Sequence, residues 1–580
     1  MARRQHWQSN FWHVGFVNGP PKLLRIPQGE QFRSRKTSIR MYVMVGKMSA
    51  VFRRICAQFA VVLVFSVGAT AAAAQSVSFK VAVAEAASGH EDIAEFYSAR
   101  DYAGIWVGSD TDAIARRNAL FAAFDAAEKH GLPASRFDAN ALEELILSAR
   151  SNHQLGFADV RLTRAFLDYG HAVQSGLVEP VAVDDNIKRR VNRDHDRVLL
   201  SELLGPDPFS FIRELAPSTP EYARLLSEKS RLEQVLADGG WGPTIQGSDT
   251  LRPGDTGPRV IALRDRLIAM GYMPNSVSRS YDAALQSAVV DFQESHGLLA
   301  DGIAGSSTIS EVNVDVDQRL KSIVVALERE RWMNRDRGER HIWVNLADFS
   351  ATIVDHGEVT FRTRSVIGAN TSDRQSPEFS DRMDYMVINP SWNVPRSIIV
   401  GEYLPQLQAD PTSASYINLI DEGGNVIDRA GVDFTQFTAS TFPFGMKQPP
   451  SNSNALGLVK FMFPNRYNIY LHDTPAKSLF GREVRAFSHG CIRLNDPFDF
   501  AYALLAKQTA DPVDYFHSIL ETGKETQVNL ETPLPVHLAY RTAFTHTDGA
   551  LQFRRDVYGR DAKIWAALAA LGVEIGAVNG

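Results

Sequence analysis

The stretch YNIYLHDTPAKSLFGREVRAFSHGCIRLNDP, residues 467–497, contains two histidines and one cysteine. Its first part, NIYLH, has the composition of a strand that ends at His472. Its last part is typical of a helix start, because Asn495 or Asp496 can cap the helix and a proline suits the first turn. We therefore expect Cys491 to lie in a glycine-containing loop between a strand and a helix, where a nucleophile can be exposed.

The thiol needs a base or a positive field, because a free cysteine has a pKa of about 8.5 and is mostly protonated at neutral pH. His472 comes from a neighbouring strand, so its ring can approach Cys491 directly, and we favour it as the base. His489 lies two residues before the thiol, with Gly490 between them, and can instead orient the loop. One histidine alone is more often structural, but this combination indicates cysteine-dependent catalysis.

Only two cysteines, Cys56 and Cys491, occur in the 580 residues. From Met48 the chain has two arginines, an apolar run and a run of alanines that ends at Ala74, which is typical of a secretory signal over residues 48–74. An uncleaved N-terminal anchor is the alternative. Residues 1–47 are basic and irregular, and we interpret them as a mis-assigned extension. Loss of Cys56 with the signal would leave a single thiol in an exported, periplasmic protein.

The composition is that of an ordinary globular protein. A chain of 580 residues with 44% hydrophobic and 22% charged residues is long enough for about three or four domains. A formal net charge of −6 gives no overall attraction to nucleic acid or to an anionic membrane. The ligands of this chain must therefore be inferred from its sites.

The hydrophobic periodicity predicts a multidomain α+β protein. Helical spacing dominates the first half, and strand-type alternation follows, as in HIWVNLADFSATIV. Within the β-rich part, a helix candidate, GEYLPQLQADP, and a turn sequence, EGGN, indicate an inserted capping subdomain, with a decorative surface excursion as the alternative. The predicted parts are a helical scaffold at 77–245, a small module with two amphipathic helices at 251–314, a β-rich domain at 320–507 that carries the candidate catalytic residues and the insertion at 397–450, and C-terminal strands and a helix at 508–580. We assign the last part to the catalytic domain, and a separate binding unit is the alternative.

Residues 251–314 resemble the peptidoglycan-binding type 1 module. Gly254-Asp255, Gly271-Tyr272, Phe292-Gln293 and Asp301-Gly302 fall where that family places its turns and core. The resemblance implies a small three-helix fold that binds peptidoglycan. A folded spacer that only positions the next domain is the alternative.

The opening stretch resembles the signature of the L,D-transpeptidase catalytic domain, also called the YkuD domain. Ser488-His489-Gly490-Cys491 is followed by Ile492-Arg493, and fifteen residues separate His472 from Ser488. The order of a helical scaffold, a peptidoglycan-binding module and a catalytic domain with a capping insertion is similar to that of the large periplasmic L,D-transpeptidases of the YcbB type. The resemblance covers nearly all of the chain after the signal.

This resemblance implies a reaction at Cys491. The thiol would attack the carbonyl of meso-diaminopimelate, the third residue of a tetrapeptide stem, expel D-alanine and form a thioester. His472 would move the protons, with its second nitrogen held by the backbone carbonyl of Asp473. The backbone N–H groups of Gly490 and Cys491 would bind the oxyanion, and Ser488 and the other loop histidine would shape the loop.

Further residues are candidates for substrate binding. Arg493 would bind a substrate carboxylate or brace the loop. Asp473, Trp392 and Tyr385 complete the set, although core packing also explains the two aromatic side chains. No cofactor or metal is expected, because the sequence has neither a zinc-type ligand set nor a phosphate-binding glycine loop.

Three functions remain open at this point. The first is a transpeptidase that forms 3-3 crosslinks in peptidoglycan from a donor tetrapeptide and an acceptor amine, with other cell-wall synthesis enzymes as possible partners and no nucleic acid. The second uses water as the acceptor, which gives an L,D-carboxypeptidase or a hydrolase that releases wall-attached proteins. The third is a non-catalytic peptidoglycan-binding protein.

Overall fold

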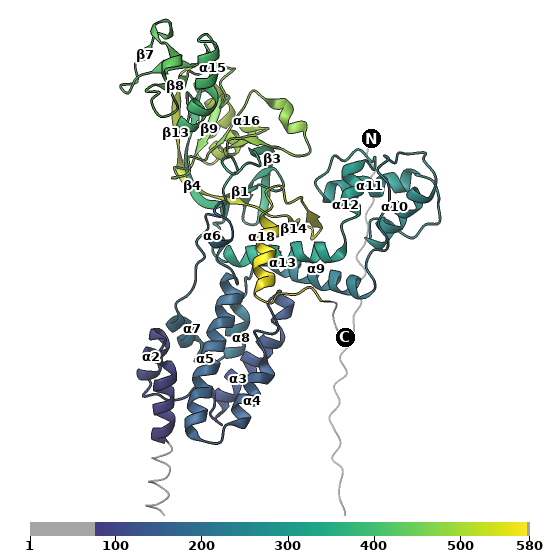
Figure 1. The fold of residues 1–580 in the computed structure, drawn as a ribbon, viewed down its shortest axis with the longest axis vertical. Helices are drawn as coiled ribbons and strands as arrows, with labels where there is room; N and C mark the ends of the chain where they lie inside the picture. The colour runs from purple at the N-terminus through teal and green to yellow at the C-terminus, as the bar shows by residue number, and fades with distance from the viewer. Residues whose placement is uncertain (1–75, 577–580) are drawn as a thin grey trace, which may run out of the picture. The chain divides into compact units, whose positions relative to one another are not determined.

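The computed structural model describes residues 76–576 and shows helical regions together with a β-rich domain, a multidomain α+β architecture (Figure 1). The predicted signal at 48–74, with Cys56, and the extension at 1–47 lie outside the described residues. Among the residues that the structure describes, no helix is long and apolar enough to cross a membrane.

The N-terminal region is a helical scaffold whose core is lined by residues such as Trp106, Leu120 and Phe166. The buried carboxylate of Asp159 accepts hydrogen bonds from the backbone N–H groups of three consecutive residues, 105–107, and so fixes the loop before α3. The helices are α2 (Glu91–Ser98), α3 (Thr111–Asp125), η1 (Glu128–His130), α4 (Ala139–Ser148), α5 (Asn152–Ser175), α6 (Pro180–Val183), α7 (Asp196–Leu203), α8 (Pro208–Glu214) and α9 (Pro220–Ala237).

A small three-helix module follows the scaffold. It consists of α10 (Pro258–Ala269), α11 (Ala283–Ser295) and α12 (Ser306–Val312), around a core of its own. Asp282 caps α11 by accepting from the N–H of Leu285 and also pairs with the buried guanidinium of Arg264. These local signals explain why so short a segment forms its own helical group (Figure 1).

Helix α13 (Val316–Trp332) joins the module to the β-rich domain and contacts several regions. It shares one core cluster with α9 and another with α18 (Arg560–Ala570). The boundary that we expected at residue 320 therefore falls inside a continuous helix. Most side chains of α13 are buried among neighbouring elements. The sequence therefore has no exposed linker at residue 320 that would separate two domains.

The β-rich domain contains a nine-stranded sheet in the order β11-β3-β12-β10-β9-β4-β13-β1-β2. Because β2 also pairs with β3, the sheet closes on itself. Strand β13 comes from the C-terminal region and lies between β4 and β1. The strands are β1 (Arg340–Asn345), β2 (Ser350–Asp355), β3 (Glu358–Gly368), β4 (Phe379–Ile388), β9 (Val459–Met462), β10 (Leu471–His472), β11 (Ala486–Ser488), β12 (Ile492–Leu494) and β13 (Thr526–Ala539).

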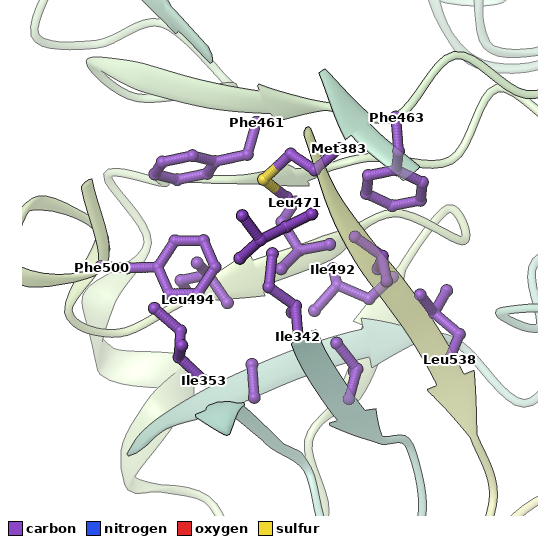
Figure 2. Packing of buried hydrophobic residues seen from close by; sticks show 14 of the residues in the cluster. Ile342, Ile353, Met383, Phe461, Phe463, Leu471, Ile492, Leu494, Phe500 and Leu538 are labelled. Atoms are coloured by element: carbon purple, nitrogen blue, oxygen red, sulfur yellow. The ribbon is translucent and has the colours of Figure 1, made fainter. Parts of the chain in front are cut away.

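The closed sheet surrounds the largest hydrophobic core of the described chain. Figure 2 shows Leu471 of β10 and Ile492 of β12 in this core, with Phe461 and Met383 from neighbouring strands. Helices α16 (Pro497–Leu505) and α17 (Pro512–Leu520) pack on it, and β14 (Ala543–Thr545) and β15 (Leu551–Phe553) form a separate hairpin. Because side chains alternate along a strand, the neighbours of these core residues point away from the core.

The capping insertion has a core and a sheet of its own. Its sheet has the order β5-β8-β6-β7, and its core includes Leu407, Leu419 and Phe434. The helix candidate and the hairpin that the sequence indicated correspond to α15 and to the β6–β7 pair. The elements are β5 (Trp392–Asn393), α14 (Arg396–Ile398), η2 (Ile399–Tyr403), α15 (Leu404–Ala409), β6 (Asn418–Ile420), β7 (Val426–Ile427), η3 (Arg429–Gly431), η4 (Phe434–Gln436) and β8 (Gly445–Gln448).

Candidate active site

The loop that carries Cys491 lies between two short strands, β11 and β12, and not directly before a helix. The predicted helix begins at Pro497, but Ile492–Leu494 form a strand that our sequence analysis assigned to the loop. Three residues are too few for a recognisable alternation, so the strand is defined by its pairing with β3 and β10. This strand fixes the position of the thiol relative to β10.

The register between β10 and β12 brings the chain segments of the histidine and of the thiol side by side. The two strands are parallel, with Leu471 opposite Ile492 and His472 opposite Arg493. Leu471 and Ile492 point into the core (Figure 2). His472 and Arg493 therefore lie on the opposite, outer face, and Tyr470 and Cys491 directly precede the paired residues in the chain. Cys491, in the loop directly before β12, and His472 of β10 are one register step apart.

His472 is buried, and its ring is held in one orientation. Its Nδ1 atom lies 2.5 Å from the backbone oxygen of Asp473, so Nδ1 carries the proton and donates it to that carbonyl group. Burial, and next the positive charge of Arg493, lower the pKa of His472 to about 3, while the carbonyl groups of Asp473 and Leu456 act in the opposite direction. The imidazole is therefore neutral at pH 7 and has an unprotonated Nε2 atom.

Cys491 is half-buried and is a free thiol. Its Sγ atom contacts the backbone oxygen of Asn468 at 3.5 Å. Burial raises the pKa of the thiol to about 11, against the opposing effects of Tyr470 and of the Arg493 guanidinium. Both members of the pair are thus neutral at pH 7, so the resting site holds a thiol and an imidazole and not a preformed ion pair.

Tyr470 is a site residue that our sequence analysis missed. Its hydroxyl contacts the thiol, and its pKa is raised by burial and by Cys491. Its ring packs edge-on against the ring of His472, with 5.6 Å between the centroids. The available signal was its spacing, because a residue two positions before a strand histidine points to the same face.

The loop before the thiol is held by hydrogen bonds from two serines. Ser488 Oγ donates to the backbone oxygen of Cys491 and accepts from the N–H of Gly490 at 3.1 Å. Ser376 Oγ, from the segment between β3 and β4, donates to the backbone oxygen of Gly490 at 2.6 Å. Gly490 has φ +114°, a conformation that favours glycine. Sequence reasoning did not identify Ser376, because it is more than a hundred residues away in the chain.

The Gly490 N–H group is already occupied, which changes our expectation for the oxyanion hole. It donates to Ser488 Oγ, whereas the N–H of Cys491 has no acceptor within residues 76–576. The Cys491 amide is therefore available to an oxyanion in this conformation, and the Gly490 amide is not.

His489 contacts the capping insertion. Its Nε2 atom lies 2.6 Å from Oε1 of Glu402 in η2, and Arg374, from the segment between β3 and β4, pairs with the same oxygen at 2.7 Å. The ring of His489 is thus engaged away from the thiol. Glu402 connects the insertion to the residue just two positions before Cys491, and sequence reasoning did not identify it.

Two cations on the outer face have no carboxylate partner in the described part of the chain. Arg493 lies beside the thiol, and its Nε atom is buried without a hydrogen bond. Lys460 of β9 lies opposite His472, and burial lowers the pKa of its amine. Cations that are half-buried and unpaired in the free protein are suited to bind a carboxylate of a ligand.

The remaining candidates lie farther from the thiol or are internally bonded. The carboxylate of Asp473 is buried and accepts from the N–H groups of Leu458 and Thr474 and from Lys477 Nζ. Trp392 packs against the core of the insertion. Tyr385 of β4 pairs with Met462 and so lies on the same outer face as His472.

Three family models match this chain. Residues 339–516 match the L,D-transpeptidase catalytic domain, YkuD. Residues 91–228 match a family described as "Scaffold domain", and residues 256–311 match one described as "Putative peptidoglycan binding domain". The chain thus contains a YkuD-type L,D-transpeptidase catalytic domain and a peptidoglycan-binding type 1 module, next to a helical scaffold.

A relative from Haemophilus influenzae, named "Putative L,D-transpeptidase", is 32% identical over 225 residues. This match covers 38% of the present chain and 45% of the relative, so it spans less than half of either protein. Two solved structures are also similar. One is the L,D-transpeptidase (residues 123-326) from Xylanimonas cellulosilytica, with 16% identity, 51% of this chain and 98% of that chain covered, and a TM-score of 0.15.

The other is a fused Zn-dependent amidase/peptidase/peptidoglycan-binding domain-containing protein from Clostridium acetobutylicum. It has 13% identity, covers 50% of this chain and 100% of that chain, and has a TM-score of 0.14. With TM-scores this low, we draw no conclusion from either structure. The family matches and the geometry described above carry the argument.

Proposed function

We propose that this protein is a cysteine-dependent L,D-transpeptidase that acts on peptidoglycan stem peptides. The observation that carries the proposal is the parallel pairing of β10 with β12, in which a neutral imidazole lies opposite an unpaired guanidinium and a free thiol stands one residue before the paired segment. The match to the L,D-transpeptidase catalytic domain supports this choice of reaction. Acyl transfer through a thioester is the chemistry that a thiol and a neutral imidazole can perform.

The first half-reaction forms the acyl-enzyme. The thiol of Cys491 attacks the carbonyl carbon of the third stem residue while Nε2 of His472 takes its proton, and the N–H of Cys491 stabilises the oxyanion. The C–N bond to the terminal D-alanine then breaks, and the imidazolium returns the proton to the leaving amine. The products are a thioester and D-alanine, with no net change in charge or oxidation state.

The neutral resting pair determines when the proton moves. Because the thiol has a raised pKa and the imidazole a lowered one, a thiolate–imidazolium pair is disfavoured before substrate binds. Proton transfer therefore accompanies the attack on the carbonyl. Arg493 supports this step, since its positive charge lowers the pKa of the nearby thiol.

The second half-reaction transfers the acyl group to an amine. The acceptor amine attacks the thioester, its proton passes to His472, and the thiol leaves with that proton restored. With the side-chain amine of a second stem as acceptor, the product is a 3-3 crosslink. We assign substrate carboxylates to Arg493 and Lys460, and a positioning role to Asp473, whose carboxylate holds the segment after β10.

The substrate class places the protein at the cell wall, and we propose a periplasmic location. The peptidoglycan-binding module supports this location, since it would hold the chain on the polymer. The donor tetrapeptide and the acceptor stem are the proposed partners, and contact with other wall-synthesis enzymes is a further expectation.

Purified protein with a soluble disaccharide-tetrapeptide provides the test. We expect wild type to release D-alanine, to add the acyl mass to Cys491, and to yield tetrapeptide–tripeptide dimers by mass spectrometry. Cys491→Ala should abolish all three signals, and His472→Gln should reduce D-alanine release by about 100-fold or more. Glu422→Gln, at an exposed residue of the insertion, serves as a control.

The products separate the remaining alternatives. D-alanine release with tripeptide as the sole product would indicate an L,D-carboxypeptidase. Full activity in Cys491→Ala would show that this thiol is not the nucleophile. Absence of any acylation in the wild type would favour a wall-binding protein.

A further inference from the structure

A cavity of about 320 Å³ lies between the three-helix module and the closed sheet, away from the thiol. The module contributes the turn after α11, residues 296–300. The sheet domain contributes the segment from Phe480 to Arg485, Arg364 of β3 and the C-terminal Arg554 and Arg555. Its volume is within the range of sites for small ligands. The two walls come from parts of the chain that are far apart in sequence.

The module is fixed against the other wall by specific contacts. Arg554 Nη1 donates to the backbone oxygen of Ser295 at 2.9 Å, and Arg555 Nε pairs with Glu311 of α12 at 3.0 Å. The ring of His296 stacks on Phe553, with 5.6 Å between the centroids. The cavity is therefore bounded by packed surfaces.

The lining carries more positive than negative charge. Five arginines face two acids, Asp348 and Glu483, and these acids are bound by Arg554 and Arg555. The other three arginines have no carboxylate partner among residues 76–576, and they are Arg364, Arg482 and Arg485. Arg485 donates to backbone oxygens, and burial lowers its pKa to about 10. Arg364 and Arg482 are exposed, and Arg364 Nη1 donates to the backbone oxygen of Phe480 at 3.3 Å.

The apolar part of the lining adds a second requirement. Leu298 and Leu299 of the module and Val484 of the opposite wall border the same cavity, and Leu299 and Val484 are exposed. A ligand that fits both sets of residues has an anionic group next to short aliphatic groups. A free phosphate ion lacks the aliphatic part, whereas a peptide rich in alanine and acidic residues has both.

We propose that this cavity binds the carboxylates of a second peptidoglycan stem peptide, one that does not react at Cys491. The inference rests on the proposed function for its choice of polymer. Arg364 and Arg482 bind the carboxylate groups, and Leu298 and Leu299 contact the side chains between them. The segment from Phe480 to Arg485 continues through β11 into the loop of Cys491, so one continuous stretch of chain connects the cavity to the thiol.

The test measures the affinity of the protein for purified sacculi and for a soluble disaccharide-tetrapeptide. Every protein carries Cys491→Ala, so that binding is measured without turnover. We expect Arg364→Gln/Arg482→Gln to weaken both interactions at least tenfold, because two charge-assisted contacts are lost. Arg213→Gln removes an exposed arginine of the scaffold and should change binding less than twofold. The Cys491→Ala protein without the arginine substitutions should also bind the tetrapeptide at least tenfold more weakly when the carboxylates of the peptide are converted to amides.

Several outcomes would overturn the proposal. Equal binding by the double variant and its parent would exclude the arginines. Unchanged binding of the amidated peptide would exclude carboxylate recognition, and displacement of the tetrapeptide by an equal concentration of inorganic phosphate would show a general anion site. A wild type that binds through the cavity but releases no D-alanine would contradict the proposed function and leave the cavity intact.

Discussion

At the residue scale, the chemistry of the site depends on burial more than on the identity of its residues. The sequence motif indicates which thiol and which histidine take part, but it cannot indicate that both are neutral in the resting protein. That property follows from desolvation, which raises the pKa of Cys491 to about 11 and lowers that of His472 to about 3. The sequence analysis did not identify Tyr470 and Ser376, because only strand pairing and loop packing bring them close to the thiol.

The pH dependence of thiol alkylation tests the neutral pair. We expect the rate constant for alkylation of Cys491 by iodoacetamide to rise about tenfold per unit from pH 7 to pH 9.5, because the thiolate fraction rises by that factor below a pKa of about 11. Peptide mass mapping assigns the label to Cys491. A preformed thiolate–imidazolium pair would instead give a rate that is nearly constant over this range.

Arg493→Gln provides a matched change for the same measurement. The guanidinium lowers the pKa of the thiol, so its removal should raise that pKa further and slow alkylation at every pH in the range. Arg493→Lys keeps the charge and should recover much of the rate. Equal rates in all three proteins would show that Arg493 does not act on the thiol electrostatically.

At the element scale, the sequence predicted those helices and hairpins that are determined by interactions between residues close together in the chain. The β6–β7 hairpin and the helix that begins at Pro497 follow from turn and proline chemistry. Strand β12 could not be predicted, since its three residues are defined by partners on β3 and β10. Asp496 occupies the N-cap position of α16, but its carboxylate accepts from Thr363 Oγ1 of β3 and not from the helix N–H groups. Tertiary contacts thus replace the local cap.

The contact between the insertion and the catalytic loop provides a prediction for Glu402→Gln. This change keeps the shape of the side chain but removes the charge that Arg374 and His489 share. We expect faster hydrogen–deuterium exchange over residues 396–409 and a lower rate of D-alanine release. The pairs are partly exposed, so the free energy of unfolding should change by less than about 1 kcal/mol.

Glu422→Gln is the control for this experiment, because Glu422 lies in the β6–β7 turn of the same insertion and forms no ion pair within the described chain. Its exchange and activity should match those of the wild type. If Glu402→Gln behaved in the same way, the contact between Glu402 and His489 would have no part in holding the insertion.

At the scale of the whole molecule, helix α13 and α18 connect the scaffold to the closed sheet through buried charges. Glu378, just before β4, pairs with Arg329 of α13 at 2.7 Å and with Arg560 of α18 at 3.1 Å. Arg329 also pairs with Asp561. Such groups are stable in the interior because each charge has a partner. The sequence predicted the C-terminal helix but neither α13 nor this network, whose members are separated by up to 232 residues.

Buried histidines in several regions give the folded protein a sensitivity to acid. Burial lowers the pKa of His130 to about 4 and that of His537 to about 3, and it also lowers that of His296. Unfolded chains bind these protons at a pKa of about 6.5, so the unfolded state holds more protons below that pH. Stability therefore rises with pH between the folded and unfolded values, and it is lost as the pH falls from about 6.5 toward 4.

Urea unfolding at pH 7, 6, 5 and 4.5 measures this loss, and His537→Gln isolates one contribution. His537 Nε2 donates to the backbone oxygen of Arg337 at 3.0 Å, and Nδ1 of the neutral ring accepts from Ser380 Oγ at 2.8 Å. Its replacement should lower stability at pH 7 but make the dependence below pH 6 shallower, by up to about 1.4 kcal/mol per pH unit. His356→Gln removes a solvent-exposed histidine and should leave the slope unchanged. Equal slopes for wild type and His537→Gln would mean that this histidine does not take up a proton on unfolding.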